Sequence, residues 1–184
     1  MGSTSLKNWM EILLAAAIAF VLTLIPIVIG EFQITLAILP LIYFGLRRGL
    51  AKGLAASLLA GVALLALHQG QSNFTTVFVT HVGPYAFIGI TGLFARNTQR
   101  TLNNKRFPNA ALNIITATTI ATILLVIWQL LAQGDTENIL ISGVLTLVAN
   151  AIILMLVARF SPKAYIPKDT PFLSRKEKSK LLND

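Results

Sequence analysis

The sequence predicts an all-α membrane protein with six transmembrane helices and both termini in the cytoplasm. Composition is the first observation: 55% of the 184 residues are hydrophobic and only 12% are charged, with a mean hydropathy of +0.73. Soluble domains carry about 25% charged residues. The second observation is a series of apolar stretches separated by short polar gaps. The third is that all fifteen Lys and Arg lie in or beside every second polar segment, so that successive crossings of the membrane would place all of them on the same side.

The positive charges predict the orientation of the chain in the membrane. Lys and Arg occur at residue 7, at 47–52, at 96–106 and at 159–180, whereas the gaps around Glu31, 68–73 and 133–138 contain none. Cytoplasmic loops retain Lys and Arg, so the basic segments are predicted to be cytoplasmic. The net charge of +8 is therefore interpreted as a surface that meets anionic membrane lipid, and no nucleic-acid partner is expected.

The first three spans are predicted at 9–29, 34–46 and 50–67. Pro26 kinks or ends the first of them, because proline lacks the N–H that an interior helical position donates. The second is short and contains Pro40, so we expect it to be tilted, broken or shielded by protein from lipid. The third is rich in small residues from Gly53 to Gly61.

The other three spans are predicted at 74–95, 110–132 and 139–160, the first of them with Gly83-Pro84 near its middle. Residues 161–184 form a polar, basic tail that contains three prolines, and we expect it to lie along the membrane surface or to be disordered. The chain is thus divided into a six-helix transmembrane domain, 1–160, and a basic cytoplasmic tail, 161–184.

No motif in the sequence predicts catalysis. The chain has no cysteine and lacks G-x-S-x-G, H-E-x-x-H and P-loop patterns, which carry nucleophiles, zinc and nucleotide phosphates. His68 and His81 have no carboxylate pattern beside them, and the middles of the spans contain essentially no Asp, Glu, Lys or Arg. We therefore expect no enzyme activity, no metal and no cofactor in this chain.

Polar side chains do occur inside the last three spans, and they face the bundle interior because polar groups in lipid are costly. On the sixth span Ser142, Thr146 and Asn150 are four residues apart, so one helix face carries them. They are either interhelical hydrogen-bonding groups or the lining of a small-molecule pocket open to the outside; their grouping on three consecutive spans favours the pocket. The whole set is Thr75, Thr76, Thr80, His81, Tyr85, Trp128, Gln129, Ser142, Thr146 and Asn150.

The first span carries a row of alanines, in which Ala15 and Ala19 form an A-x-x-x-A pair beside Ala16 and Ala17. Small residues let helices approach closely in lipid. The row therefore serves either packing within the bundle or docking of a partner membrane protein, and the motif alone does not distinguish the two.

Four segments resemble one known family: AAIAF at 16–20 with LIP at 24–26, LRRGL at 46–50 followed by GL at 53–54, GITGLF at 89–94, and VAN at 148–150. In their order and placement they resemble the S components of energy-coupling factor (ECF) vitamin transporters, in particular the thiamine-specific S components. The resemblance covers roughly residues 10 to 160.

The resemblance implies a protein of the bacterial cell membrane that binds one vitamin near the outer face. It also implies partners, namely a transmembrane coupling protein and two ATPase subunits that hydrolyse ATP. In this family small residues of the first helix contact the coupling protein, which assigns Ala15, Ala16 and Ala19 to partner docking.

Only some of the binding residues of the family are retained in this sequence. The family's Glu–Tyr pair on the fourth span falls at Thr80 and His81, whereas the family's Asn on the sixth span is retained as Asn150. An aromatic residue of the fifth span corresponds to Trp128 in an alignment that needs a gap there. A family tyrosine on the sixth span is replaced by Leu145. The expected substrate-binding residues are Thr80, His81, Tyr85, Trp128, Thr146 and Asn150.

Loss of the acidic residue bears on the substrate. Thiamine carries a fixed positive charge, and a buried cation without a counter-charge is costly. We therefore expect a smaller, uncharged relative, either a hydroxymethylpyrimidine precursor or a form of vitamin B6, with thiamine itself retained as a third candidate. The alternative function is a membrane sensor domain of a signalling system, although residues 161–184 leave little room for an output domain.

Overall fold

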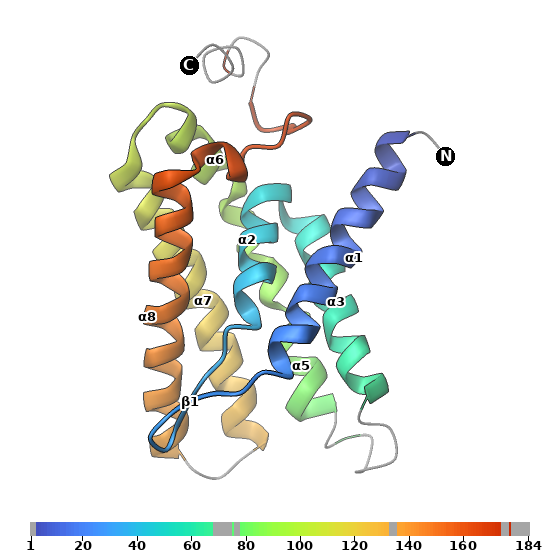
Figure 1. Cartoon of the computed structure of the whole chain (residues 1–184), viewed down its shortest axis with the longest axis vertical. Coiled ribbons are helices and arrows are strands. Elements are labelled where there is room, and N and C mark those ends of the chain that lie inside the picture. The colour runs from blue at the N-terminus through green and yellow to red at the C-terminus, as the bar shows by residue number, and fades with distance from the viewer. Residues whose placement is uncertain (1–2, 68–74, 76–77, 133–135, 174–176, 178–184) are drawn as a thin grey trace.

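The computed structural model describes residues 3–67, 75, 78–132, 136–173 and 177. Five helices run roughly along the long axis of a bundle (Figure 1). They are α1 (Ser3–Thr23), α2 (Ile38–Arg48), α3 (Leu50–Leu67), α7 (Phe107–Ala132) and α8 (Thr136–Phe160). The shorter elements are the hairpin β1 (Ile27–Ile29) and β2 (Phe32–Ile34), the π-helix η1 (Phe78–Val82), α5 (Gly83–Ala86), the 3₁₀-helix η2 (Ile88–Phe94), α6 (Ala95–Asn103) and α9 (Pro162–Tyr165).

Four helices of the described residues are long and apolar enough to cross a membrane, namely 6–23 of α1 and the whole of α3, α7 and α8. Their mean hydropathies lie between 1.5 and 2.5. Large apolar side chains such as Leu13, Val62 and Val144 are more than half exposed on them, as lipid-facing surfaces are. The predicted helical membrane fold is thus confirmed in its main features, and the third, fifth and sixth predicted spans match α3, α7 and α8 closely.

The prediction of a first span reaching residue 29 is wrong, because α1 ends at Thr23 and the chain then forms a β-hairpin. Pro26 cannot continue the helical hydrogen bonds, and the β-branched residues of Ile27–Ile29 suit a strand. Gly30 turns the chain with a φ of 64°, a conformation that glycine adopts without strain. Val28 pairs with Gln33 across the hairpin, and α2 begins at Ile38 instead of residue 34.

The fourth predicted span, 74–95, is also corrected: its described part is not one helix but a π-helix, a short α-helix and a 3₁₀-helix in succession. Pro84 interrupts the regular ladder. The glycines of η2 then bring its backbone against α2 and α3. A Cβ added to Gly89 would lie 2.2 Å from the backbone of Gly53, and one added to Gly92 would lie 2.5 Å from that of Gly49. Close backbone packing therefore replaces regular helix geometry here.

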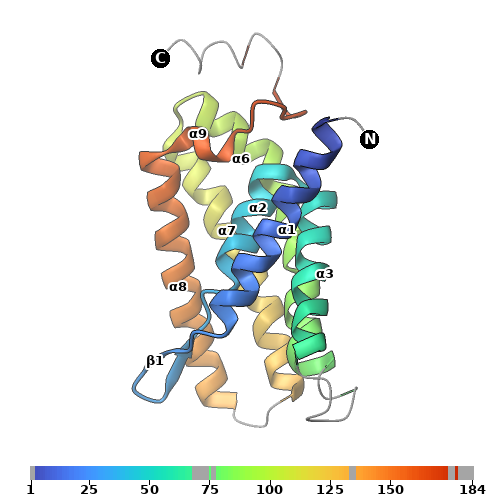
Figure 2. The ribbon, with the colours of Figure 1, turned by 45° about the vertical axis from the view of Figure 1, so that its right-hand side comes forward.

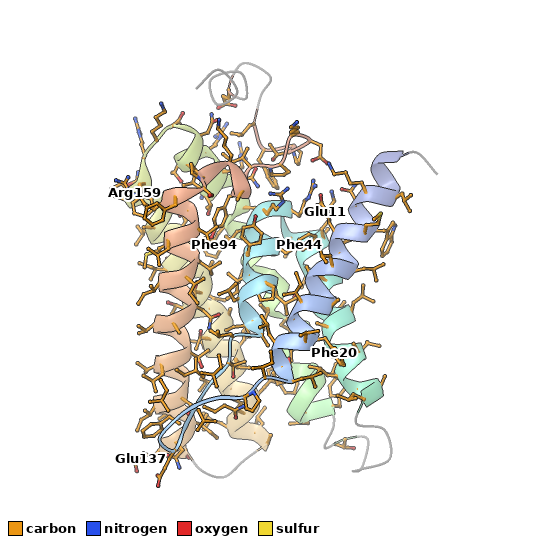
Figure 3. The ribbon with its side chains drawn as sticks, viewed as in Figure 1. Glu11, Phe20, Phe44, Phe94, Glu137 and Arg159 are labelled. Carbon is orange, nitrogen blue, oxygen red and sulfur yellow. The ribbon has the colours of Figure 1, made fainter. Side chains whose placement is uncertain are left out.

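The Lys and Arg of the described residues gather at one end of the bundle, which we call the basic end. There α6 and α9 cover the bundle, and α1 begins at the same end (Figures 1 and 2). The hairpin and the start of α8 lie at the opposite end, which we call the far end; Glu11 and Glu137 mark the two ends in Figure 3. The charge separation read from the sequence is thus present in three dimensions.

The first half of the tail packs across the basic end. The buried Tyr165 hydroxyl donates a 2.9 Å hydrogen bond to the Leu154 carbonyl, and the Thr170 hydroxyl donates one of 2.6 Å to Gln99. Of the two expectations for the tail, disorder does not describe residues 161–173, because hydrogen bonds and buried side chains fix them on the bundle.

An ionic cluster joins the tail to two helices. Arg48, only 7% exposed, donates from Nη1 to both oxygens of Asp169 at 2.7 and 2.8 Å. Its Nε and Nη2 donate to the Glu11 carboxylate, the latter at 2.6 Å. We call these three residues the Arg48 clamp; it ties α1, the end of α2 and the tail together.

Candidate functional site

One face of α8 carries the predicted row of polar residues, and this row holds the hairpin segment in place. The Gln33 N–H donates to Ser142 Oγ at 3.1 Å, and the Thr35 N–H donates to Thr146 Oγ1 at 3.1 Å. Asn150 Nδ2 completes the row by donating to the Thr35 carbonyl at 3.0 Å. The hairpin consequently lies across the far half of α8, as Figures 1 and 2 show.

Asn150 keeps unused hydrogen-bonding capacity. Its Nδ2 also donates to the Thr146 carbonyl at 2.7 Å, but its buried Oδ1 has no partner among the described residues, and neither has Thr122 Oγ1 on α7. Gly143 faces Val126 closely enough that an added Cβ would lie 2.5 Å from it, so antiparallel α7 and α8 place Thr122 near the level of Thr146. An unsatisfied buried polar atom costs about 1–3 kcal/mol, which a ligand donor would recover.

Tyr85 lies on α5 and is 6% exposed. Its hydroxyl is 3.4 Å from the Thr23 hydroxyl, which also lies 2.9 Å from the Ala19 carbonyl. Tyr85 therefore meets the far end of α1, where the chain leaves the helix for the hairpin. Tyr85, a predicted site residue, is thus held by Thr23, which the sequence did not single out.

Trp128 forms an aromatic group with two residues of the broken fourth segment. Its ring is parallel to that of Phe87, with centroids 6.4 Å apart and an interplanar angle of 7°, and edge-on to Phe78 at 6.3 Å. The indole lies directly on Gly83, where an added Cβ would come within 2.4 Å of it. A glycine at this position thus permits a flat, half-buried aromatic surface.

Thr80 and His81 lie on the π-helix η1, between Phe78 and Gly83; their side chains are outside the described part of the chain, as is all of Thr76. Wide helical turns of this kind are frequent at functional sites. The backbone therefore brings this predicted pair next to the aromatic group of Trp128.

Charge separates this region from the basic end. Glu31 and Glu137, the carboxylates of the described far end, are both exposed. Glu11 and Asp169 lie at the basic end, bonded to Arg48. The buried and half-buried side chains described in the far half thus offer aromatic rings, hydroxyls and the Asn150 amide, and no carboxylate is among them.

The structure adds residues that the sequence did not single out. Thr23 and Thr35 have no distinguishing spacing, and Thr122 is one of several threonines on α7. Gly83 is the exception, because the Gly83-Pro84 pair was visible as an interruption of the fourth span. Only the structure shows that a side chain at position 83 would overlap the Trp128 ring.

The three alanines assigned to docking are buried in this chain, Ala15 to 7% exposure, Ala16 to 6% and Ala19 to 1%. Ala15 also lines a groove of about 360 Å³ between α1 and α2, together with Leu14, Ile18 and Tyr43 among others. Ala19 therefore serves internal packing, whereas Ala15 borders this groove.

Comparisons with known proteins agree with this architecture. The model of the thiamine transporter protein family (Thia_YuaJ) matches residues 9–133. The solved structure of ThiT from Listeria monocytogenes matches with a TM-score of 0.78 and 22% identity, over 90% of this chain and 100% of that one. No curated protein matched. These matches confirm the resemblance to thiamine-type S components and identify a multi-pass membrane transport protein. The chain belongs to the thiamine transporter family.

Proposed function

We propose that this protein is the substrate-binding S component of an ECF-type vitamin uptake transporter in the bacterial plasma membrane. It binds a neutral thiamine-related heterocycle of the hydroxymethylpyrimidine class at the far end and delivers it with a coupling protein and two ATPase subunits. The observation that carries the substrate class is Asn150, whose unpartnered buried Oδ1 lies in a region without a described interior carboxylate.

The chemistry of the side chains at the far end supports a pyrimidine. An amide oxygen accepts from a ring amino group, the hydroxyls near Thr146 and Tyr85 serve ring nitrogens or a hydroxymethyl group, and Trp128 stacks on the flat ring. Pyridoxine shares the hydroxymethyl groups and the flat ring, and is the second compound to test. Thiamine would bring its cationic thiazolium to a region where only the exposed Glu31 and Glu137 supply described negative charge.

Six spans with both termini cytoplasmic are part of this proposal. Besides the four long helices, α2 and the broken segment 78–94 would each cross the membrane inside the protein. This is supported by the fully buried residues Ile38, Leu41 and Ile88, since short or irregular backbone is tolerated at membrane depth where protein shields it. The basic end would then be cytoplasmic.

Equilibrium binding to the purified protein tests the substrate class. Hydroxymethylpyrimidine, pyridoxine and thiamine are titrated separately, and tight binding of the pyrimidine with weak binding of thiamine is expected. Nanomolar thiamine binding without binding of the pyrimidine or of pyridoxine would refute the neutral-ligand assignment while leaving the S-component assignment intact.

Asn150→Ala should weaken pyrimidine binding about tenfold, because one hydrogen bond is worth about 1 kcal/mol and its loss leaves a ligand donor unpaired. Ser142→Ala is the matched control, since it removes a hairpin contact on the same helix face without touching the unpartnered amide oxygen. Equal losses in both variants would mean that Asn150 acts only through the hairpin.

Co-purification tests the partner. Ala15→Trp should release the coupling protein while ligand binding persists, whereas Ala17→Trp on the exposed side of the same helix should retain the complex. Ile18→Trp, at an exposed position lining the same groove, provides a second test if Ala15→Trp does not fold. Retention of the complex by both groove variants would exclude this docking surface.

A further inference from the structure

A small pocket at the basic end is not used by the proposed transport site. It has a volume of about 280 Å³ and lies where α7 begins, α8 ends and α9 follows. Arg159 marks its position in Figure 3. Its lining is apolar apart from two cationic side chains, and consists of Leu102, Lys105, Phe107, Ala158, Arg159 and Pro162.

Arg159 is oriented by an aromatic ring. Its Cζ lies 5.4 Å from the centroid of Phe107, a cation–π distance. Stacking occupies a face of the guanidinium and leaves the in-plane N–H donors available, which are the groups that bind phosphate oxygens. Helix α7 begins at Phe107, so the positive end of its dipole adds to the same region.

Lys105 reaches the pocket from an uncommon backbone conformation. Its φ is 56°, and its N–H donates to the Leu102 carbonyl while the Arg106 N–H donates to Thr101. These bonds form the helix end in which glycine is usual, because a side chain is strained there. Lys105 is thus held in this conformation at a cost in backbone strain, and its side chain lines the pocket.

The surroundings of the pocket are apolar and exposed. Phe160, next to Arg159, is 80% exposed, and Leu112 on α7 and Leu156 on α8 are 65% and 49% exposed. Both helices are long and apolar enough to cross a membrane. A lipid in this pocket would therefore have its anionic group in a site lined by two cationic side chains and its hydrocarbon chains along the helices.

We propose that this pocket binds the headgroup phosphate of an anionic phospholipid, with Lys105 and Arg159 as its two ligands. This goes beyond the general attraction of a basic surface to a membrane, because it assigns one lipid to one place. Phosphatidylglycerol fits the site as a single-phosphate anionic lipid, whereas phosphatidylcholine carries a choline cation that the two basic side chains would repel.

The test uses the full-length protein in zwitterionic detergent. The rise in unfolding temperature is followed as short-chain phosphatidylglycerol is added, and phosphatidylcholine and inorganic phosphate are titrated in parallel. The wild type should respond to phosphatidylglycerol alone. Lys105→Gly should be at least as stable as the wild type without lipid, because glycine relieves the backbone strain, yet need about fivefold more lipid for half-saturation.

Arg159→Gln should show a similar loss of lipid response. Arg96→Gln is the control: it removes one exposed charge from α6, nine residues before Lys105 or about 13 Å along a helix, and should respond as the wild type does. An unchanged response in both pocket variants would overturn the site. A weaker lipid response in Arg96→Gln, or an equal response of the wild type to phosphatidylcholine, would mean that general attraction to the membrane explains the binding and would overturn the specific site. An equal response to inorganic phosphate would exclude the lipid assignment.

Discussion

Replacing Arg48 with Leu should be among the most destabilising changes at the basic end. The Arg48 side chain is 2% exposed, whereas those of its partners Glu11 and Asp169 are 22% and 43% exposed. Removing one member of a buried ion pair costs about 3–5 kcal/mol, and the partial exposure of both carboxylates places Arg48→Leu near the lower limit, at about 3 kcal/mol. Asp169→Asn removes only the ion pair with the more exposed of the two carboxylates and should cost about 1 kcal/mol.

Unfolding in mixed micelles with increasing denaturing detergent measures these differences, and hydrogen exchange locates them. Both variants should increase exchange in residues 162–173, because the clamp fixes this segment to α2. Lys163→Gln, an exposed charge in the same segment, should change neither quantity. A larger loss for Asp169→Asn than for Arg48→Leu, or no loss in either, would refute the assignment of Arg48 as the central residue of the cluster.

The clamp also predicts a dependence on pH. Burial alone would raise the pKa of Asp169, but its hydrogen bonds and attraction to Arg48 outweigh this and hold the pKa below its ordinary value. The stabilisation is therefore present above the usual pKa of Asp, about 3.9, and is lost as the pH falls through the lowered pKa of the folded state. Asp169→Asn should remove this part of the acid-induced loss of stability.

Two further predictions concern helix packing and the hairpin. Gly89→Ala should cost at least about 2 kcal/mol of folding stability and lower the yield of monodisperse protein, because its Cβ would overlap backbone atoms. Gly61→Ala, whose Cβ would meet the nearest atom at 3.2 Å, should have a much smaller effect. Equal yields of the two variants would contradict this packing. Thr146→Val should speed hydrogen exchange of the Thr35 amide about fivefold, whereas Thr116→Val, at a half-buried position on α7, should not. An unchanged rate would show that the Thr35–Thr146 bond contributes nothing.

The spacing of Ser142, Thr146 and Asn150 correctly predicted a shared helix face, but not the groups that this face binds. Two of the three accept from hairpin amides and the third donates to the Thr35 carbonyl. Backbone partners more than a hundred residues away have no signal in the local sequence. These bonds confirm the interpretation as hydrogen-bonding groups, whereas the interpretation as a ligand pocket stays a prediction.

The hairpin was missed for a related reason. Residues 24–29 are uniformly apolar, and hydropathy does not distinguish the end of a span from a strand of Ile and Val. Likewise the fourth segment has the composition of a span, while its helix type changes twice. Gly89 and Gly92 allow η2 to touch the backbones of Gly53 and Gly49, a contact that composition does not encode.

The sequence by itself determined the membrane class, the separation of charge between the two ends and the family, because hydropathy, net charge and short motifs are properties of contiguous residues. Only the tertiary structure decided that Arg48 clamps the tail, that Asn150 holds the hairpin and that Lys105 and Arg159 meet at one pocket. Each of these depends on side-chain direction and on pairing between distant segments, which are fixed when the helices pack and not before.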